Sequence, residues 1–139
     1  MNITIIDGHG GMLGAQLVKE ISARIKDASI TAVGTNATAT SAMLKAGAQK
    51  AATGENPVIV ACRKADVIIG PVGIVIADSL WGEITPKMAL AVGQADAVRI
   101  LIPMNKCDNL IAGFGDLKVN LLIEDAMAKL EGIIASCNP

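Results

Sequence analysis

The sequence predicts an α/β fold, a three-layer sandwich in which helices cover both faces of a parallel sheet of about five strands. Two observations carry this prediction. Short runs of β-branched residues alternate with segments of helical periodicity, which is typical of a parallel sheet flanked by helices. The chain has 139 residues, 52% hydrophobic and 18% charged, which suffices for one domain with its own core. We therefore expect a single domain over residues 1–139.

The first half of the chain alternates between strand and helix patterns. Buried strands are predicted at residues 3–6 and 30–33. The helix between them has apolar residues at four-residue spacing, namely Leu13, Leu17, Ile21 and Ile25. A second helix follows, capped by Asn36 or Thr38 and stopped by Gly47.

The middle of the chain repeats this order with weaker signals. Residues 50–53 form a weak third strand. A helix then begins at Asn56-Pro57, with asparagine as the cap and proline at the first helical position, although the valines and isoleucine that follow favour a strand by composition. Residues 66–71 form a clear strand that stops at Gly70-Pro71.

An apolar segment punctuated by glycine, residues 72–84, comes next and is here called the lid. It is too long for a tight turn, so we expect it to pack as an irregular or partly helical segment. Thr85-Pro86 then opens a helix that Gly93 ends. A strand at residues 98–102 and a helix at about residues 117–134 complete the fold.

Composition excludes several partners. The net charge is −1 and the twelve basic residues are spread along the chain, so there is no basic stripe for nucleic acid. Trp81 and Phe114 are the only aromatic side chains on which bases could stack. The longest strongly apolar stretch, residues 67–77, is too short to span a bilayer, which takes about 20 residues, and the amino terminus lacks the features of a signal peptide. We expect a cytoplasmic protein, and its three separated cysteines fit reduced thiols rather than a zinc site.

A glycine-rich turn, residues 7–14 and here called the glycine loop, lies where the first strand passes into the first helix. Such a turn needs a residue without Cβ, lets a pyrophosphate approach the backbone and packs the helix closely on the strand. Free amides at the helix start would hold the phosphates. The cofactor-binding residues predicted here are Gly8, His9, Gly10, Gly11, Met12 and Gly14. The alternative is a tight turn that binds nothing.

The spacing of glycines 8, 11 and 14 resembles the loop of the extended short-chain dehydrogenases, which implies a Rossmann-like, doubly wound sheet and NAD or NADP as the cofactor. An acid after the second strand would mark NAD and an arginine would mark NADP. Thr35 and Asn36 stand there instead. They could bind a ribose or cap the next helix, so the choice of cofactor stays open.

Loops after the first, fourth and fifth strands are expected to converge at the carboxyl edge of the sheet. The second of these loops contributes Gly70, Pro71, Gly73, Asp78 and Ser79 to the predicted cofactor-binding set, and the third contributes Asn105. Glu83 could also line a pocket, while turns and helix caps are the alternative for each of these polar residues.

Asn105-Lys106-Cys107-Asp108 matches the motif with which small GTPases recognise guanine. The chain has no Walker loop, so we attribute the match to chance. Lys106 could still contact a phosphate.

Nearly the whole sequence resembles a family of small bacterial proteins described only as a domain of unknown function. The blocks that carry the resemblance are Ile6-Asp7-Gly8, Ala32-Val33-Gly34-Thr35-Asn36, residues 40–48, residues 52–56, Ile69-Gly70-Pro71, residues 73–80 and residues 82–86. The resemblance implies no activity, but it suggests that the lid and the glycine loop belong to one site.

These patterns predict a protein that binds a small phosphorylated ligand, a nucleotide or a dinucleotide such as NAD or NADP. No complete catalytic set is found, and His9, the only histidine, is expected to be a solvated loop side chain. Two alternatives remain open: an oxidoreductase that completes its site across a homodimer, and a non-catalytic nucleotide-responsive sensor or scaffold protein. The lid and Trp81 are the surface predicted to form the homodimer.

Overall fold

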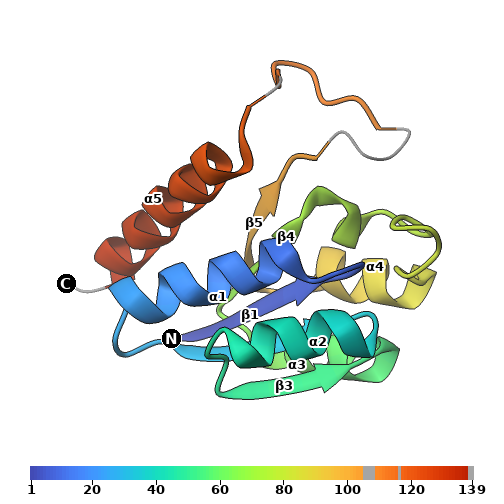
Figure 1. The fold of residues 1–139 in the computed structure, drawn as a ribbon, viewed down its shortest axis with the longest axis horizontal. Helices are drawn as coiled ribbons and strands as arrows, with labels where there is room; N and C mark the ends of the chain where they lie inside the picture. Colours follow the sequence, from blue (N-terminus) through green and yellow to red (C-terminus); the bar gives the residue numbers. More distant parts are fainter. Residues whose placement is uncertain (105–108, 116, 138–139) are drawn as a thin grey trace.

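A five-stranded parallel sheet forms the centre of the protein, as seen in a computed structural model that describes residues 1–104, 109–115 and 117–137. The strand order is β3-β2-β1-β4-β5, and every neighbouring pair is parallel. The strands are β1 (Asn2–Asp7), β2 (Ser29–Gly34), β3 (Lys50–Thr53), β4 (Val67–Pro71) and β5 (Val98–Ile102). The predicted α/β class with a Rossmann-like sheet is confirmed (Figure 1).

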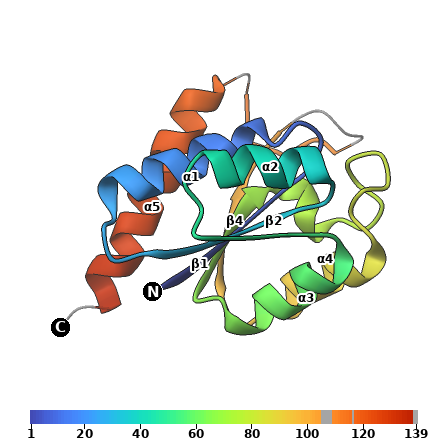
Figure 2. The same ribbon diagram turned by 60° about the horizontal axis from the view of Figure 1, so that its bottom comes forward.

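Helices cover both faces of the sheet. They are α1 (Met12–Arg24), α2 (Ala37–Lys45), α3 (Glu55–Lys64), α4 (Pro86–Gln94) and α5 (Val119–Cys137). Figure 2 shows α1, α2 and α5 on one side of the sheet and α3 and α4 on the other. The outer layers thus complete a three-layer sandwich.

The core is divided by the sheet into two apolar clusters. Because successive side chains of a strand point to opposite faces, Ile5 packs with α1, α2 and α5, while its neighbour Ile6 packs with α3 and α4. Leu17 and Ile21 are fully buried at the spacing that predicted α1. Both faces of β1 are therefore buried as far as the glycine loop.

Most helix boundaries follow the predicted capping residues. The Asn36 side chain accepts a hydrogen bond from the Ala39 amide at the start of α2, and Thr85 caps α4 in the same way through the Met88 amide. The predicted start of α3 is wrong. Its cap is Gly54, at φ +106°, and Asn56-Pro57 lie within the first turn, where a proline removes no helical hydrogen bond.

Three other boundaries differ by one to three residues. Helix α4 continues through Gly93 to Gln94, because this glycine has an ordinary helical backbone rather than a positive φ. Helix α5 begins at Val119 and runs to Cys137. Val119 is exposed, so the buried face of α5 starts at Ile123 rather than at the first predicted apolar position.

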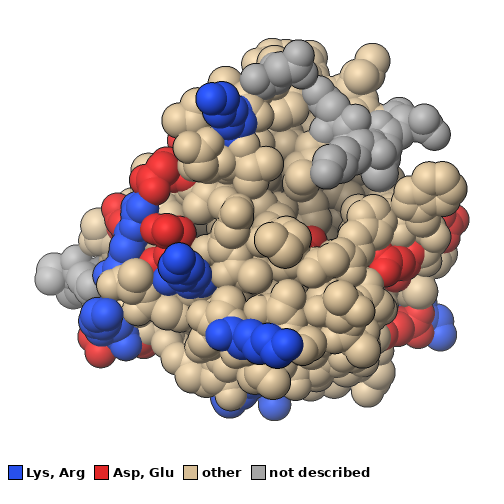
Figure 3. Space-filling view, in the orientation of Figure 1, with Lys and Arg blue, Asp and Glu red and all other residues tan. Residues whose placement is uncertain are grey.

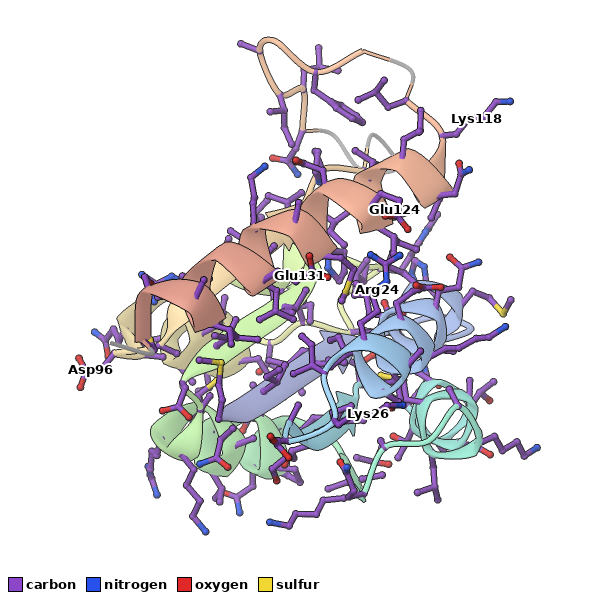
Figure 4. The ribbon with its side chains drawn as sticks, turned by 90° about the vertical axis from the view of Figure 1, so that its left-hand side faces the viewer. Arg24, Lys26, Asp96, Lys118, Glu124 and Glu131 are labelled. Atoms are coloured by element: carbon purple, nitrogen blue, oxygen red, sulfur yellow. The ribbon has the colours of Figure 1, made fainter. Side chains whose placement is uncertain are left out.

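An arginine at the end of α1 joins that helix to α5. Arg24 forms ion pairs with Glu20 on its own helix and with Glu124 and Glu131 on α5 (Figure 4). The hydrogen bond from Arg24 lowers the pKa of Glu124 below its usual value. These groups lie at the surface, so they orient the two helices more than they stabilise them.

The charged groups elsewhere are dispersed. On the face shown in Figure 3, lysines, arginines and acids stand mainly around the margin and leave a largely uncharged centre. None of the described helices is long and apolar enough to cross a membrane.

The strand order places a crevice between β1 and β4. From β1 the chain first moves outward to β2 and β3, then returns to β4 on the other side of β1. Ligands of open parallel sheets bind outside the carboxyl ends of the strands at such a reversal. The glycine loop and the lid both leave the sheet at this point (Figure 1).

Candidate functional site

A cavity of about 190 Å³ lies at this crevice. Residues that follow β1, β4 and β5 all contribute to its wall, which confirms that the three loops converge. The lining residues are Asp7, Gly8, His9, Gly10, Gly11, Met12, Leu13, Pro71, Val72, Gly73, Ile76, Leu80, Met104 and Asn109. The lid side of the wall is formed mainly by apolar residues, and the glycine-loop side includes three glycines, Gly8, Gly10 and Gly11.

The predicted site residues divide into those that line this cavity and those that do not. Seven line it: Gly8, His9, Gly10, Gly11, Met12, Pro71 and Gly73. Six others lie behind or beside it: Gly14, Thr35, Asn36, Gly70, Asp78 and Ser79. Asn105 and the rest of the predicted guanine-like motif lie outside the described residues. The lining side chains Val72, Ile76, Leu80 and Met104 were missed because nothing in their pattern separates them from core residues.

Two glycines of the loop serve helix packing. Gly11 has φ +72°, and a Cβ built on it would lie 2.6 Å from the Cα of Ala39 in α2. A Cβ on Gly14 would lie 2.5 Å from Met43 Sδ and 2.9 Å from Asp7 Cβ. Both glycines therefore let α1 approach its neighbours closely.

The other two glycines differ in their surroundings. A Cβ on Gly10 would meet only the Met12 side chain, at 3.9 Å, so this position is open. A Cβ on Gly8 would instead fill a narrow space between Thr35, Leu80 and Glu83. Gly10 is therefore the glycine of the loop beside which the start of α1 has unfilled space.

Asp7 closes part of the turn with its own carboxylate. Its Oδ1 accepts the Gly8 amide at 2.8 Å, and its Oδ2 accepts the Gly14 amide at 2.7 Å. The side chain is buried, and this burial raises the pKa of Asp7, against the lowering effect of the two amide hydrogen bonds. The Asp7 carboxylate thus accepts hydrogen bonds from two of the backbone amides around the start of α1.

The raised pKa of Asp7 gives a testable pH dependence. Above pH 3.8 the folded protein retains a proton that the unfolded chain has released, so the contribution of Asp7 to stability falls as pH rises through the folded pKa. We expect the free energy of unfolding of the wild type, minus that of Asp7→Asn, to decrease with rising pH in this window. Urea denaturation of both proteins at several pH values measures this difference. A difference that grows with pH would contradict the assignment.

Three amides at the start of α1 remain available. Gly11 donates to the carbonyl of Gly8 at 2.9 Å, and the His9 amide is bound by Glu83. In the described part of the chain, the amides of Gly10, Met12 and Leu13 have no acceptor. Such groups carry the positive end of the helix dipole and bind anions.

The lid folds back onto the glycine loop in an unusual backbone conformation. It begins as a 3-10 turn, η1 (Val72–Val75). Beyond this turn, Asp78, Leu80 and Trp81 all have positive φ, which costs energy in residues other than glycine. The buried Ser79 hydroxyl donates to the Gly73 carbonyl, and the Asp78 amide donates to the Ile84 carbonyl at 2.7 Å. The lid is therefore held at its base, while Trp81 at its tip is 94% exposed.

Glu83 fastens the lid to the glycine loop. Its Oε2 accepts the His9 amide at 2.9 Å, and its Oε1 accepts the Asn36 side-chain amide at 2.6 Å. The same carboxylate lies 3.6 Å from His9 Nε2. The sequence showed Glu83 as one of several polar lid residues but could not indicate that it would reach the end of β2.

Thr35 and Asn36 behave differently at the end of β2. Asn36 caps α2 and also donates to the His9 carbonyl at 2.9 Å, so the capping alternative is confirmed. The Thr35 amide donates to the Asp7 carbonyl at 3.0 Å. Its Oγ1 is buried and has no hydrogen-bond partner among the described residues. An orphaned buried hydroxyl of this kind calls for an explanation.

The cavity brings few chemically reactive groups together. Asp7 and His9 are the titratable side chains among its described lining residues. Cys62 lies in the cluster with α3 and α4 and does not line the cavity, and burial raises its pKa to about 11, so it is a protonated thiol at neutral pH.

Comparison with known proteins places nearly the whole chain in one sequence family. Residues 2–135 match the family described as "Domain of unknown function (DUF3842)". None of the curated proteins matches the chain.

Proposed function

The chain belongs to this family of unknown function, and we propose, on the geometry of its loops, that it binds a small phosphorylated ligand of the nucleotide or dinucleotide class. The observation that carries the proposal is the set of three unpartnered amides, of Gly10, Met12 and Leu13, at the wall of the cavity. A phosphate placed there would accept from these amides and lie on the axis of a 13-residue helix.

The remaining wall fits the rest of such a ligand. Pro71, Val72, Ile76, Leu80 and Met104 offer an apolar surface opposite the amides. The cavity is smaller than the about 300–1,000 Å³ of most ligand sites, so it accommodates one part of a nucleotide while the remainder lies outside. NAD and NADP are candidates because their two halves extend to either side of a central pyrophosphate.

A nucleotide-responsive role is favoured over a catalytic one by the lid. The strained residues Asp78, Leu80 and Trp81 hold an exposed aromatic side chain directly beside the cavity wall. A ligand in contact with Leu80 would shift the conformational equilibrium of the lid. This shift would change how the exposed Trp81 side chain is oriented toward a partner. The predicted homodimer, with the lid as its interface, belongs to the same proposal.

A thermal-shift screen with a charged and a neutral variant of the same size tests the binding site. We would screen NAD, NADP, ATP, GTP, coenzyme A and flavins against the wild type, Gly10→Glu and Gly10→Gln. A ligand at a hundred times its Kd adds about 2.7 kcal/mol of stability, which raises the Tm by several degrees. We expect at least one nucleotide to raise the Tm of the wild type and of Gly10→Gln, but not of Gly10→Glu, whose carboxylate would face the free amides.

Gly10 is suited to this test because its Cβ meets open space and its backbone is not left-handed. Both variants are therefore expected to fold, which their unliganded Tm values check. A Tm shift that survives in Gly10→Glu would place the ligand elsewhere. The absence of any shift in the wild type would remove the proposal.

A further inference from the structure

The acid expected near the end of the second strand of an NAD site comes from the lid in this protein. In dinucleotide-binding folds, a carboxylate at that place accepts a hydrogen bond from the ribose 2′-hydroxyl. Here β2 ends at Gly34, and Thr35 and Asn36 follow, so the strand itself supplies no acid. The Glu83 carboxylate nevertheless lies there, bound to Asn36 at 2.6 Å.

Two oxygen atoms converge on a bare glycine at this place. A Cβ built on Gly8 would lie 2.6 Å from Thr35 Oγ1, 2.8 Å from Glu83 Oε2 and 2.9 Å from the apolar Leu80 Cδ1. Thr35 Oγ1 is the orphaned hydroxyl described above. The space beside Gly8 is therefore bounded by a carboxylate and by an unpartnered hydroxyl. A side chain in place of Gly8 would displace both groups.

We propose that Glu83 is the sugar-recognising carboxylate of the site and selects ligands whose ribose has a free 2′-hydroxyl, as in NAD, over those with a 2′-phosphate, as in NADP. This inference rests on the proposed function, because it presupposes phosphates on the amides at the start of α1. With the phosphates there, the sugar of one half of the ligand lies toward β2, and the other half lies toward the cavity beside β4.

The carboxylate keeps the capacity to accept a further hydrogen bond. Each oxygen of Glu83 accepts one hydrogen bond from the protein, and a carboxylate oxygen can accept two. The side chain is 24% exposed, so a ligand can reach it. A 2′-phosphate at the same place would meet a like charge at short range, because Asn36 and the His9 amide fix the carboxylate.

The neighbouring groups do not offset this repulsion. Glu83 lies beside the cavity rather than in its wall, and none of the described residues that line the cavity is a lysine or an arginine. Asp7, which accepts the Gly8 and Gly14 amides, adds a second carboxyl at the glycine loop. His9, whose Nε2 lies 3.6 Å from Glu83, is the nearest group that can carry positive charge. The described surroundings therefore favour a neutral hydroxyl over a second phosphate.

Titrations of NAD and NADP into the wild type and Glu83→Gln test the inference, with binding followed by calorimetry. We expect the wild type to bind NAD about tenfold more tightly than NADP, the effect of one hydrogen bond to a charged group. In Glu83→Gln the affinity for NAD falls by about the same factor while that for NADP does not, so the preference disappears. The ratio is the decisive quantity, because a loosened lid would weaken both ligands equally.

Asp96→Asn serves as the charge-matched control. Asp96 precedes β5 and therefore lies at the opposite edge of the parallel sheet, so this variant removes one negative charge far from the site. It is expected to keep the wild-type ratio. Equal affinity of the wild type for NAD and NADP, or an unchanged ratio in Glu83→Gln, would overturn the inference but leave nucleotide binding intact. Failure of both ligands to bind would overturn the inference, and the screen of other nucleotides decides whether the proposed function falls with it.

Discussion

Replacing Gly11 by alanine is expected to lower the free energy of unfolding by about 2–5 kcal/mol. The first cause is the left-handed backbone, at φ +72°, which costs any residue with a Cβ about 1–2 kcal/mol. The second is the contact with α2, because the new methyl group would lie 2.6 Å from the Cα of Ala39 and 2.8 Å from its carbonyl oxygen. These are backbone atoms, so α1 and α2 would have to separate. Chemical denaturation measures the loss.

The neighbouring glycine provides the control. Gly10→Ala places its methyl group in open space, 3.9 Å from the Met12 side chain, and is expected to leave stability nearly unchanged. Equal losses in the two variants would mean that the loop requires flexibility at both positions rather than close packing at Gly11. A stable Gly11→Ala variant would show that the approach of α1 to α2 is looser than the structure indicates.

Truncating Ile84 to alanine is expected to cost about 2–5 kcal/mol, the range found for large apolar residues in a core. Ile84 is fully buried at the end of the lid and packs in the cluster between the sheet, α3 and α4. Its backbone also anchors the lid, since its amide donates to the Ser79 carbonyl and its carbonyl accepts the Asp78 amide. The cavity left by the truncation would therefore loosen the segment that carries Glu83. Thermal and urea unfolding measure the effect.

Trp81→Ala is the matched control on the same lid. The Trp81 side chain is 94% exposed, so its removal is expected to change the stability of the isolated chain little. A large loss in Trp81→Ala would show that the exposed ring is covered in solution, as the predicted homodimer requires. A negligible loss in Ile84→Ala would mean that the lid does not depend on this core contact.

The strands and most helices could be predicted because each carries a local signal. Runs of β-branched residues predicted four of the strands, and residues 50–53, a weak prediction with one β-branched residue, are β3. Helix α3 shows where local signals conflict. Its valines and isoleucine favour a strand, but Val58, Ala61 and Cys62 form a buried face at helical spacing, and this packing prevails. Its start was misplaced because proline is acceptable anywhere in a first turn.

The site was less predictable because it depends on contacts between distant segments. The glycine loop could be located from the spacing of its glycines. The separate structural role of each glycine could not be predicted. Gly11 and Gly14 face α2, which only the docked helix reveals. Glu83 reaches the His9 amide across 74 residues, and no pattern within the lid encodes that partner. Sequence therefore indicated where a ligand would lie but not which side chains would surround it.

The contact between Glu83 and the glycine loop also bears on the order of events during synthesis. The glycine loop and β1 leave the ribosome before the lid, which comes after β4, and Glu83 follows His9 by 74 residues. Contacts of such high sequence separation form slowly, because a long stretch of chain must be ordered before they are made. A nascent chain that ends before β4 therefore lacks the lid, and the wall of the crevice beside the amides of α1 is complete only after the residues that follow β4 and β5 have been made.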